Sequence, residues 1–137
     1  MAKSVKHQKG RKGRARPSHK HKPTYRRVLL KISGEGLSAP QGFGLGRDAL
    51  DYVASQVAEV RALNVQVAIV VGGGNMIRGA SLAGDSRIPE ATAHQMGMLA
   101  TVINALALRE TFEAAGMKAR VLSSLPVASV CEPFDRL

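Results

Sequence analysis

VVGGGNMIRGA, residues 70–80, joins the end of an apolar run to three consecutive glycines and an arginine. The run VQVAIVV, residues 65–71, has the length of a strand, and a continuous apolar strand is typical of a parallel sheet. Three glycines let the backbone turn tightly and approach a ligand, and their N–H groups can converge on an oxyanion. Arg78 adds a permanent planar cation. The stretch therefore predicts a phosphate-binding loop, with a plain strand-to-helix turn as the alternative.

The flanking sequence predicts an α/β fold. RVLLKI, residues 27–32, is a first strand, and residues 47–63 carry the apolar stripe of a helix that Asn64 can close in the left-handed conformation. Residues 91–116 form a second helix that is apolar nearly all round, as in a helix buried in the fold or in a subunit interface. KARVLSS, residues 118–124, is a third strand. We expect an open, mainly parallel sheet with helices on both faces.

The charge is divided unevenly along the chain. Of the 20 Lys and Arg residues, 11 lie in residues 1–27, which contain no acid, so the rest of the chain is close to neutral. Residues 1–24 have too few apolar side chains to form a core, and we expect a disordered basic extension. The alternatives for this extension are an RNA-binding or assembly arm, a solvated extension, a start codon placed too far upstream, and an organelle transit peptide. Any nucleic-acid binding is expected through this tail alone.

Several classes of protein are disfavoured by composition. Cys131 is the only cysteine, so no intrachain disulfide is possible, which fits a reducing cytoplasm. No apolar run reaches the roughly 18 residues of a membrane helix, and no secretory signal is recognisable. The histidines suggest no metal site, because His94 stands alone and the other three lie in the tail. The glycine pattern is neither a P-loop nor a dinucleotide fingerprint.

Lys31 marks the end of the first strand as a second candidate loop. A charge at the end of an apolar strand is costly unless it finds a partner, and it could act as a point charge on a transferring phosphoryl group. Ser33 and Gly34 follow and could add donors. The alternative is a lysine that snorkels at an edge.

Four segments together resemble the bacterial uridylate (UMP) kinases of the amino acid kinase family. These are YRRVLLKISGEGL, QGFGLG, VVGGGNMIRGA and QMGMLATVINALALRE, in that order, and the resemblance covers residues 25–133. It implies an amino acid kinase-like fold and transfer of the ATP γ-phosphate to UMP, with Mg²⁺, giving UDP for pyrimidine nucleotide biosynthesis. It also implies a cytoplasmic homohexamer that GTP activates and UTP inhibits.

The resemblance also assigns roles to particular positions. Lys31 would stabilise the transferred charge, and the long second helix would form part of a subunit interface. The implied ligand contacts are with ATP for Lys31, Ile32, Ser33, Gly34, Gly74 and Arg78, with UMP for Gly73, and with the GTP effector for Arg109.

Two departures from the family pattern affect the expectation. His94-Gln95 stands where the family carries an aspartate that holds the UMP ribose, and His94 is the candidate substitute. The family's second half, with further UMP and ATP contacts, has no counterpart here. We therefore expect residues 25–137 to be the N-terminal portion of the kinase domain, a truncated form that is inactive alone. The alternatives are a nucleic-acid-binding protein acting through its tail, and a sister kinase for carbamate, acetylglutamate or aspartate.

Overall fold

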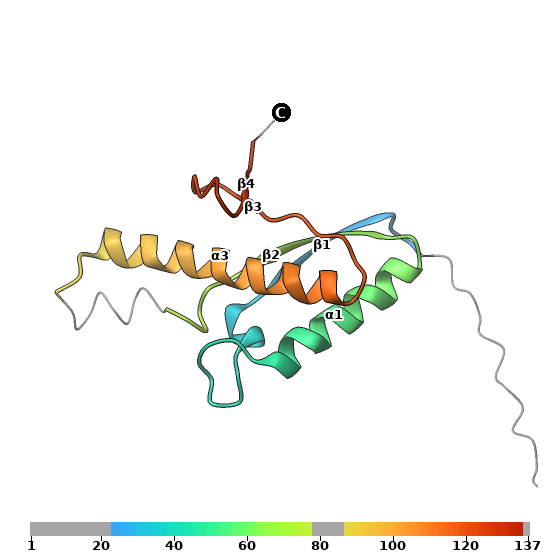
Figure 1. Ribbon diagram of the computed structural model, residues 1–137, viewed down its shortest axis with the longest axis horizontal. Coiled ribbons are helices and arrows are strands. Elements are labelled where there is room, and N and C mark those ends of the chain that lie inside the picture. Colours follow the sequence, from blue (N-terminus) through green and yellow to red (C-terminus); the bar gives the residue numbers. More distant parts are fainter. Residues whose placement is uncertain (1–22, 78–86, 136–137) are drawn as a thin grey trace, which may run out of the picture.

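The computed structural model describes residues 23–77 and 87–135. Its elements, in chain order, are β1 (Arg27–Ile32), the 3-10 turn η1 (Gly34–Leu37), α1 (Arg47–Ala62), β2 (Gln66–Val71), α3 (Glu90–Ala114), β3 (Leu122–Ser123) and β4 (Glu132–Pro133) (Figure 1). Most of the tail, which we expected to be disordered, and Arg78 lie outside these ranges. No helix in the described ranges is long and apolar enough to cross a membrane.

β1 and β2 confirm the predicted strand–helix–strand unit. They pair in parallel and in register, with Arg27 opposite Gln66 and Ile32 opposite Val71. Asn64 ends α1 with a φ of 60°, in the left-handed conformation expected from the sequence. Because the register has no offset, both strands end at the same level, and the loops that follow them leave the same edge of the sheet.

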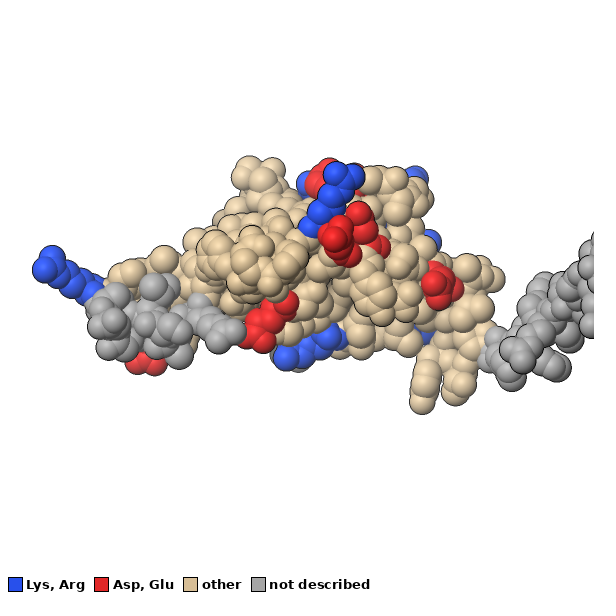
Figure 2. Space-filling model, turned by 90° about the horizontal axis from the view of Figure 1, so that it is seen from below, with Lys and Arg blue, Asp and Glu red and all other residues tan. Residues whose placement is uncertain are grey.

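Charged side chains of the folded body are mixed in sign. Lys and Arg lie among Asp and Glu on the face seen in Figure 2, where no continuous patch of one sign forms. The excess positive charge of the chain therefore belongs to its first 27 residues.

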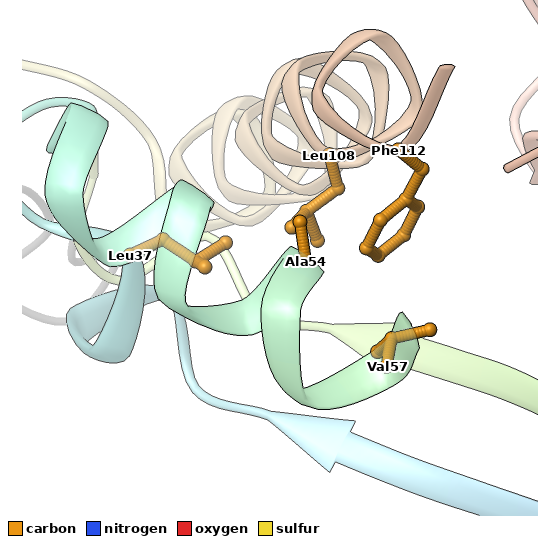
Figure 3. Packing of buried hydrophobic residues seen from close by; sticks show 5 residues of the cluster. All are labelled: Leu37, Ala54, Val57, Leu108 and Phe112. Atoms are coloured by element: carbon orange, nitrogen blue, oxygen red, sulfur yellow. The ribbon is translucent and has the colours of Figure 1, made fainter. Parts of the chain in front are cut away.

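The core lies between the two helices and one face of the sheet. Leu37 of η1 and two α1 residues meet two α3 residues, and Figure 3 shows these side chains pointing toward one another: Leu37, Ala54, Val57, Leu108 and Phe112. The alternate β2 residues Val67, Ile69 and Val71 pack against this cluster. Leu37 is fully buried at its centre.

The expectation of helices on both faces of the sheet is not met in the described ranges. α1 and α3 pack against each other and share the face that carries Val67 and Ile69. The opposite face leaves Leu29 72% and Val70 52% exposed. α3 also has an uncovered side, because Leu99 and Ile103 are about half exposed, although Val102 on another side packs against Val121.

The predicted third strand does not join the sheet of β1 and β2, as an open sheet would require. Only Leu122–Ser123 is a strand, and it pairs with Glu132–Pro133 instead of β2. A cavity of about 650 Å³ is lined on one side by β2 and on the other by residues 117–124. Contacts with more distant residues explain this pairing, since Val121 is buried with Cys131 and Val102 of α3, and Arg120 forms a two-pronged ion pair with Glu132. The hydrogen bonds that Arg120 donates to the Glu132 carboxylate lower the pKa of Glu132.

Leu37 provides the first test, because it joins η1 to both helices. We expect Leu37→Ala to lower the free energy of unfolding by about 2–5 kcal/mol, the usual cost of lost apolar contact plus a cavity. Urea unfolding measures this change. Leu63→Ala is the matched control, since Leu63 is half exposed and should change stability by less than about 1 kcal/mol. Equal effects of the two substitutions would contradict the described core.

Candidate functional site

The two loops that leave the carboxyl ends of β1 and β2 are in contact. The Gly72 N–H donates to the Ile32 carbonyl at 2.9 Å and extends the ladder by one bond. Gly34 lies so close to residues 72–75, hereafter the glycine loop, that a Cβ on Gly34 would stand 2.5 Å from Gly74 N and 2.7 Å from Asn75 Oδ1. Only glycine fits there, so the KISGE and GGGN segments form one packed unit.

Gly73 has the same requirement on the other side of the glycine loop. A Cβ on Gly73 would lie 2.8 Å from both Ala100 Cβ and the Gly97 carbonyl oxygen of α3. Neither Gly34 nor any glycine of the loop has a positive φ. The loop therefore needs glycine chiefly for close packing against η1 and α3, which the sequence argument from tight turns did not anticipate.

Gly74 differs from its neighbours because a side chain there would meet only ordinary contacts. A methyl group added at Gly74 would have Glu35 Cγ as its nearest neighbour, at an ordinary 3.8 Å. In the described ranges, the backbone N–H groups of Gly73, Gly74 and Asn75 donate to no acceptor. Three consecutive N–H groups without a described acceptor, beside a strand end, are the kind of donor set that can bind an oxyanion.

Two buried amides, absent from the sequence-based site, fasten the loop. Asn75 and Asn104 of α3 are almost completely buried and donate to each other, at 3.1 Å from Asn75 and 2.6 Å from Asn104. Asn104 also donates to the Gly72 carbonyl, and Asn75 to the Gly44 carbonyl, both at 2.7 Å. The signal was visible as a lone amide inside the apolar run VINALAL.

Lys31 lies on the uncovered face of the sheet. Its register partner is Val70, so it belongs to the face opposite the helices, and its side chain is exposed. The cost of burying its charge, part of the sequence argument, therefore does not arise in this structure. Ile32 packs on the core cluster, and Ser33 makes no side-chain cap at the start of η1.

His94 lies on the first turns of α3. Its Nε2 is 3.4 Å from Glu90 Oε1, and both side chains are largely exposed. His94, Gly97 and Thr101 are three and four residues apart and share one stripe of the helix. Gly97 and Thr101 are the residues that flank Gly73, so His94 is one turn beyond the contact with the glycine loop.

Arg109 is not part of this cluster. It follows Thr101 by eight residues, about 12 Å along the helix axis. Its guanidinium donates to Glu110 Oε1 at 2.6 Å and to the Val130 carbonyl at 3.5 Å, and the bond to Glu110 raises its pKa. The structure thus brings Lys31, Ser33, Gly34, Gly73 and Gly74 to one edge of the sheet, with Arg109 at a separate location.

Metal-ligating side chains do not cluster in the part of the chain that the structure describes. No group of three His, Cys, Asp or Glu residues is close enough there to hold an ion. The described groups near the glycine loop are backbone donors, the exposed Lys31 ammonium group, the Ser33 hydroxyl and the Glu35 side chain.

The fold and the paired loops define the class, an α/β protein with a candidate ligand site where two parallel strands end. The chain belongs to the amino acid kinase family, whose sequence profile matches residues 26–134. The uridylate kinases of Psychrobacter cryohalolentis and Vibrio campbellii are each 46% identical, over 82% and 83% of this chain.

Solved structures agree with this assignment. The UMP kinase from Bacillus anthracis matches 81% of this chain with a TM-score of 0.75 and 36% identity. The UMP kinase from Ureaplasma parvum matches 87% with a TM-score of 0.71 and 28% identity. The chain spans about half the length of these relatives, between 46% and 50% of each.

Alanine substitutions at the glycines test the packing of the two loops. Gly34→Ala and Gly73→Ala should each lower the free energy of unfolding by roughly 1–3 kcal/mol, because the added methyl group meets backbone atoms. Gly74→Ala is the matched control and should change it by less than about 0.5 kcal/mol, since its methyl group meets only Glu35 at an ordinary contact distance. Thermal unfolding of the three variants gives the comparison, and a large loss for Gly74→Ala alone would contradict the described arrangement.

Proposed function

We propose that this chain carries the ATP-phosphate half of a UMP kinase site, which transfers the γ-phosphate of ATP to UMP and yields UDP. The observation that carries the proposal is the single packed unit of KISGE and GGGN, in which the N–H groups of residues 73–75 have no acceptor within the described ranges and Lys31 stands near the end of the adjoining strand. The 46% identity to uridylate kinases supports UMP as the acceptor over the substrates of sister kinases.

The proposed ATP contacts follow the geometry of the sheet edge. The N–H groups of residues 73–75 and the first turn of η1 would hold phosphate oxygens, and the Lys31 ammonium would offset charge on the transferred group. Ser33 supplies an exposed hydroxyl, and Gly74 leaves room for the ligand. Ile32 contributes its backbone, because its side chain packs in the core. Arg78, outside the described ranges, is proposed as a further phosphate contact.

The proposed UMP contacts lie on the α3 side of the glycine loop. Gly73 packs against one stripe of α3, and His94 lies on the same stripe, one helical turn away. The His94 imidazole would hydrogen-bond the ribose in place of the family aspartate, after leaving Glu90. Mg²⁺ is proposed to arrive as MgATP, since the described side chains form no cluster for it and Mg²⁺ is commonly held by substrate phosphates.

Assembly and regulation are proposed from the exposed parts of α3. Met98, Leu99 and Ile103 form an apolar stripe that a second copy would cover in a homo-oligomer, a hexamer by analogy with the family. Arg109, separate from the glycine loop, is the proposed contact for a GTP effector, with UTP as the opposing one. The proposed location is the cytoplasm.

A lysine substitution tests the phosphate site in the 137-residue chain. We expect the chain to bind MgATP and Lys31→Met to weaken that binding about 10- to 100-fold, the effect of removing a charged hydrogen bond. Titration calorimetry measures the Kd. Lys118→Met, which removes an exposed lysine far along the chain, is the control and should leave the Kd unchanged. Equal Kd values for Lys31→Met and the original chain would contradict the assignment.

Turnover tests the acceptor. The 137-residue chain should form no ADP on addition of UMP, because phosphoryl transfer depends on a full set of positioning contacts. The same chain extended by the second half of the P. cryohalolentis uridylate kinase should form UDP and ADP in equal amounts. Turnover with carbamate, acetylglutamate or aspartate in place of UMP would instead favour a sister kinase, and robust turnover by the short chain would contradict the proposed division of the site.

A further inference from the structure

The backbone of the glycine loop needs contacts from outside the loop to hold it in one conformation. Three consecutive glycines lose more backbone freedom on becoming fixed than any other residues would. Binding an oxyanion with the N–H groups of residues 73–75 is effective only if those donors are already held in place. Within the described ranges, the loop's backbone bonds are few: Gly72 donates to Ile32, Met76 and Ile77 donate to the Gly73 carbonyl, and Gly44 donates to the Asn75 carbonyl.

The buried amide pair supplies this support through two anchors. Asn104 ties the loop's start to α3 through the Gly72 carbonyl, at 2.7 Å. Asn75 ties its end to the 38–46 connection, where its side chain donates to the Gly44 carbonyl and its own carbonyl accepts from the Gly44 N–H at 2.9 Å. The reciprocal bonds between the two amides join these anchors.

Only asparagine at both positions satisfies this network. Each side-chain amide uses both of its hydrogens and its oxygen, and no buried side-chain polar atom in the described ranges lacks a partner. Aspartate has no hydrogens to donate, and leucine of the same shape would leave the Gly72 and Gly44 carbonyls without these donors. The side chains are almost completely buried, so water does not readily replace them.

We propose that Asn75 and Asn104 are positioning residues that hold the glycine loop against α3 and keep its three free N–H groups ready for phosphate. This inference rests on the proposed function for the identity of the ligand. The holding of the loop itself is a property of the nucleotide-free chain, and it can be measured separately.

Amide hydrogen exchange of the 137-residue chain tests the holding step. The reporters are the N–H groups of Gly44, Gly72 and Met76, each of which takes part in a backbone hydrogen bond with the glycine loop as donor or acceptor. The Leu50 N–H in α1 is the internal reference. Asn104→Leu and Asn75→Leu should lower protection at the three reporters about tenfold or more relative to Leu50. Thr111→Val is the matched control, since it removes a hydrogen bond on α3 to Ala107 and should change the ratio by less than about twofold.

MgATP affinity, measured by calorimetry, tests the positioning step. Asn104→Leu should raise the Kd about tenfold or more, whereas Thr111→Val should leave it unchanged. The double variant Asn75→Leu/Asn104→Leu guards against misfolding, because removing both amides leaves no unpaired side-chain amide. It should regain stability while its reporters stay unprotected and its Kd stays high.

The outcomes separate the two claims. Unchanged reporter protection in both single variants would overturn the inference, and so would lost protection with an unchanged Kd, which reduces the pair to a structural role. A wild-type chain that binds no MgATP would contradict the proposed function, and the exchange arm would still decide whether the amide pair holds the loop, since it needs no nucleotide.

Discussion

The in-register pairing of β1 and β2 is the constraint on which the rest of the structure depends. A parallel pair needs a crossover, which α1 provides, and α1 then brings Leu37 and its own apolar face to α3. With no offset between the strands, two loops leave the sheet at one level and meet. A slip of one residue would turn the apolar set of β2 away from the helices and separate Gly34 from the glycine loop.

The regular elements were predictable from the sequence because their signals are local. Apolar runs gave β1 and β2, an apolar stripe gave α1, and a long segment that is apolar nearly all round gave α3, with ends shifted by no more than two residues. The 118–124 segment shows the limit of such reasoning. Its β-branched, apolar content indicated a strand, but its pairing depends on Glu132 and Cys131, which are distant in sequence and carry no strand signal of their own.

The candidate site was predictable in position and less so in cause. Parallel strand ends located Lys31 and the three glycines, but the reasons changed once the contacts were known. Gly34 and Gly73 are needed for packing, and Lys31 is exposed instead of buried. The Asn75–Asn104 pair was missed because the role of a buried amide depends on its hydrogen-bond partner, and these two residues lie 29 positions apart in the sequence. Arg109 could be placed only by its distance along α3.

The direction of β1 has a practical consequence for handling the protein. The chain enters the sheet at Arg27 and reaches the loops at Ile32, six residues or about 20 Å later. Whatever precedes Arg27 is thus joined at the pole away from the glycines. An affinity tag or fluorescent fusion at the amino terminus is therefore expected to leave the candidate site clear, whereas a label on Ser33 would lie at that site.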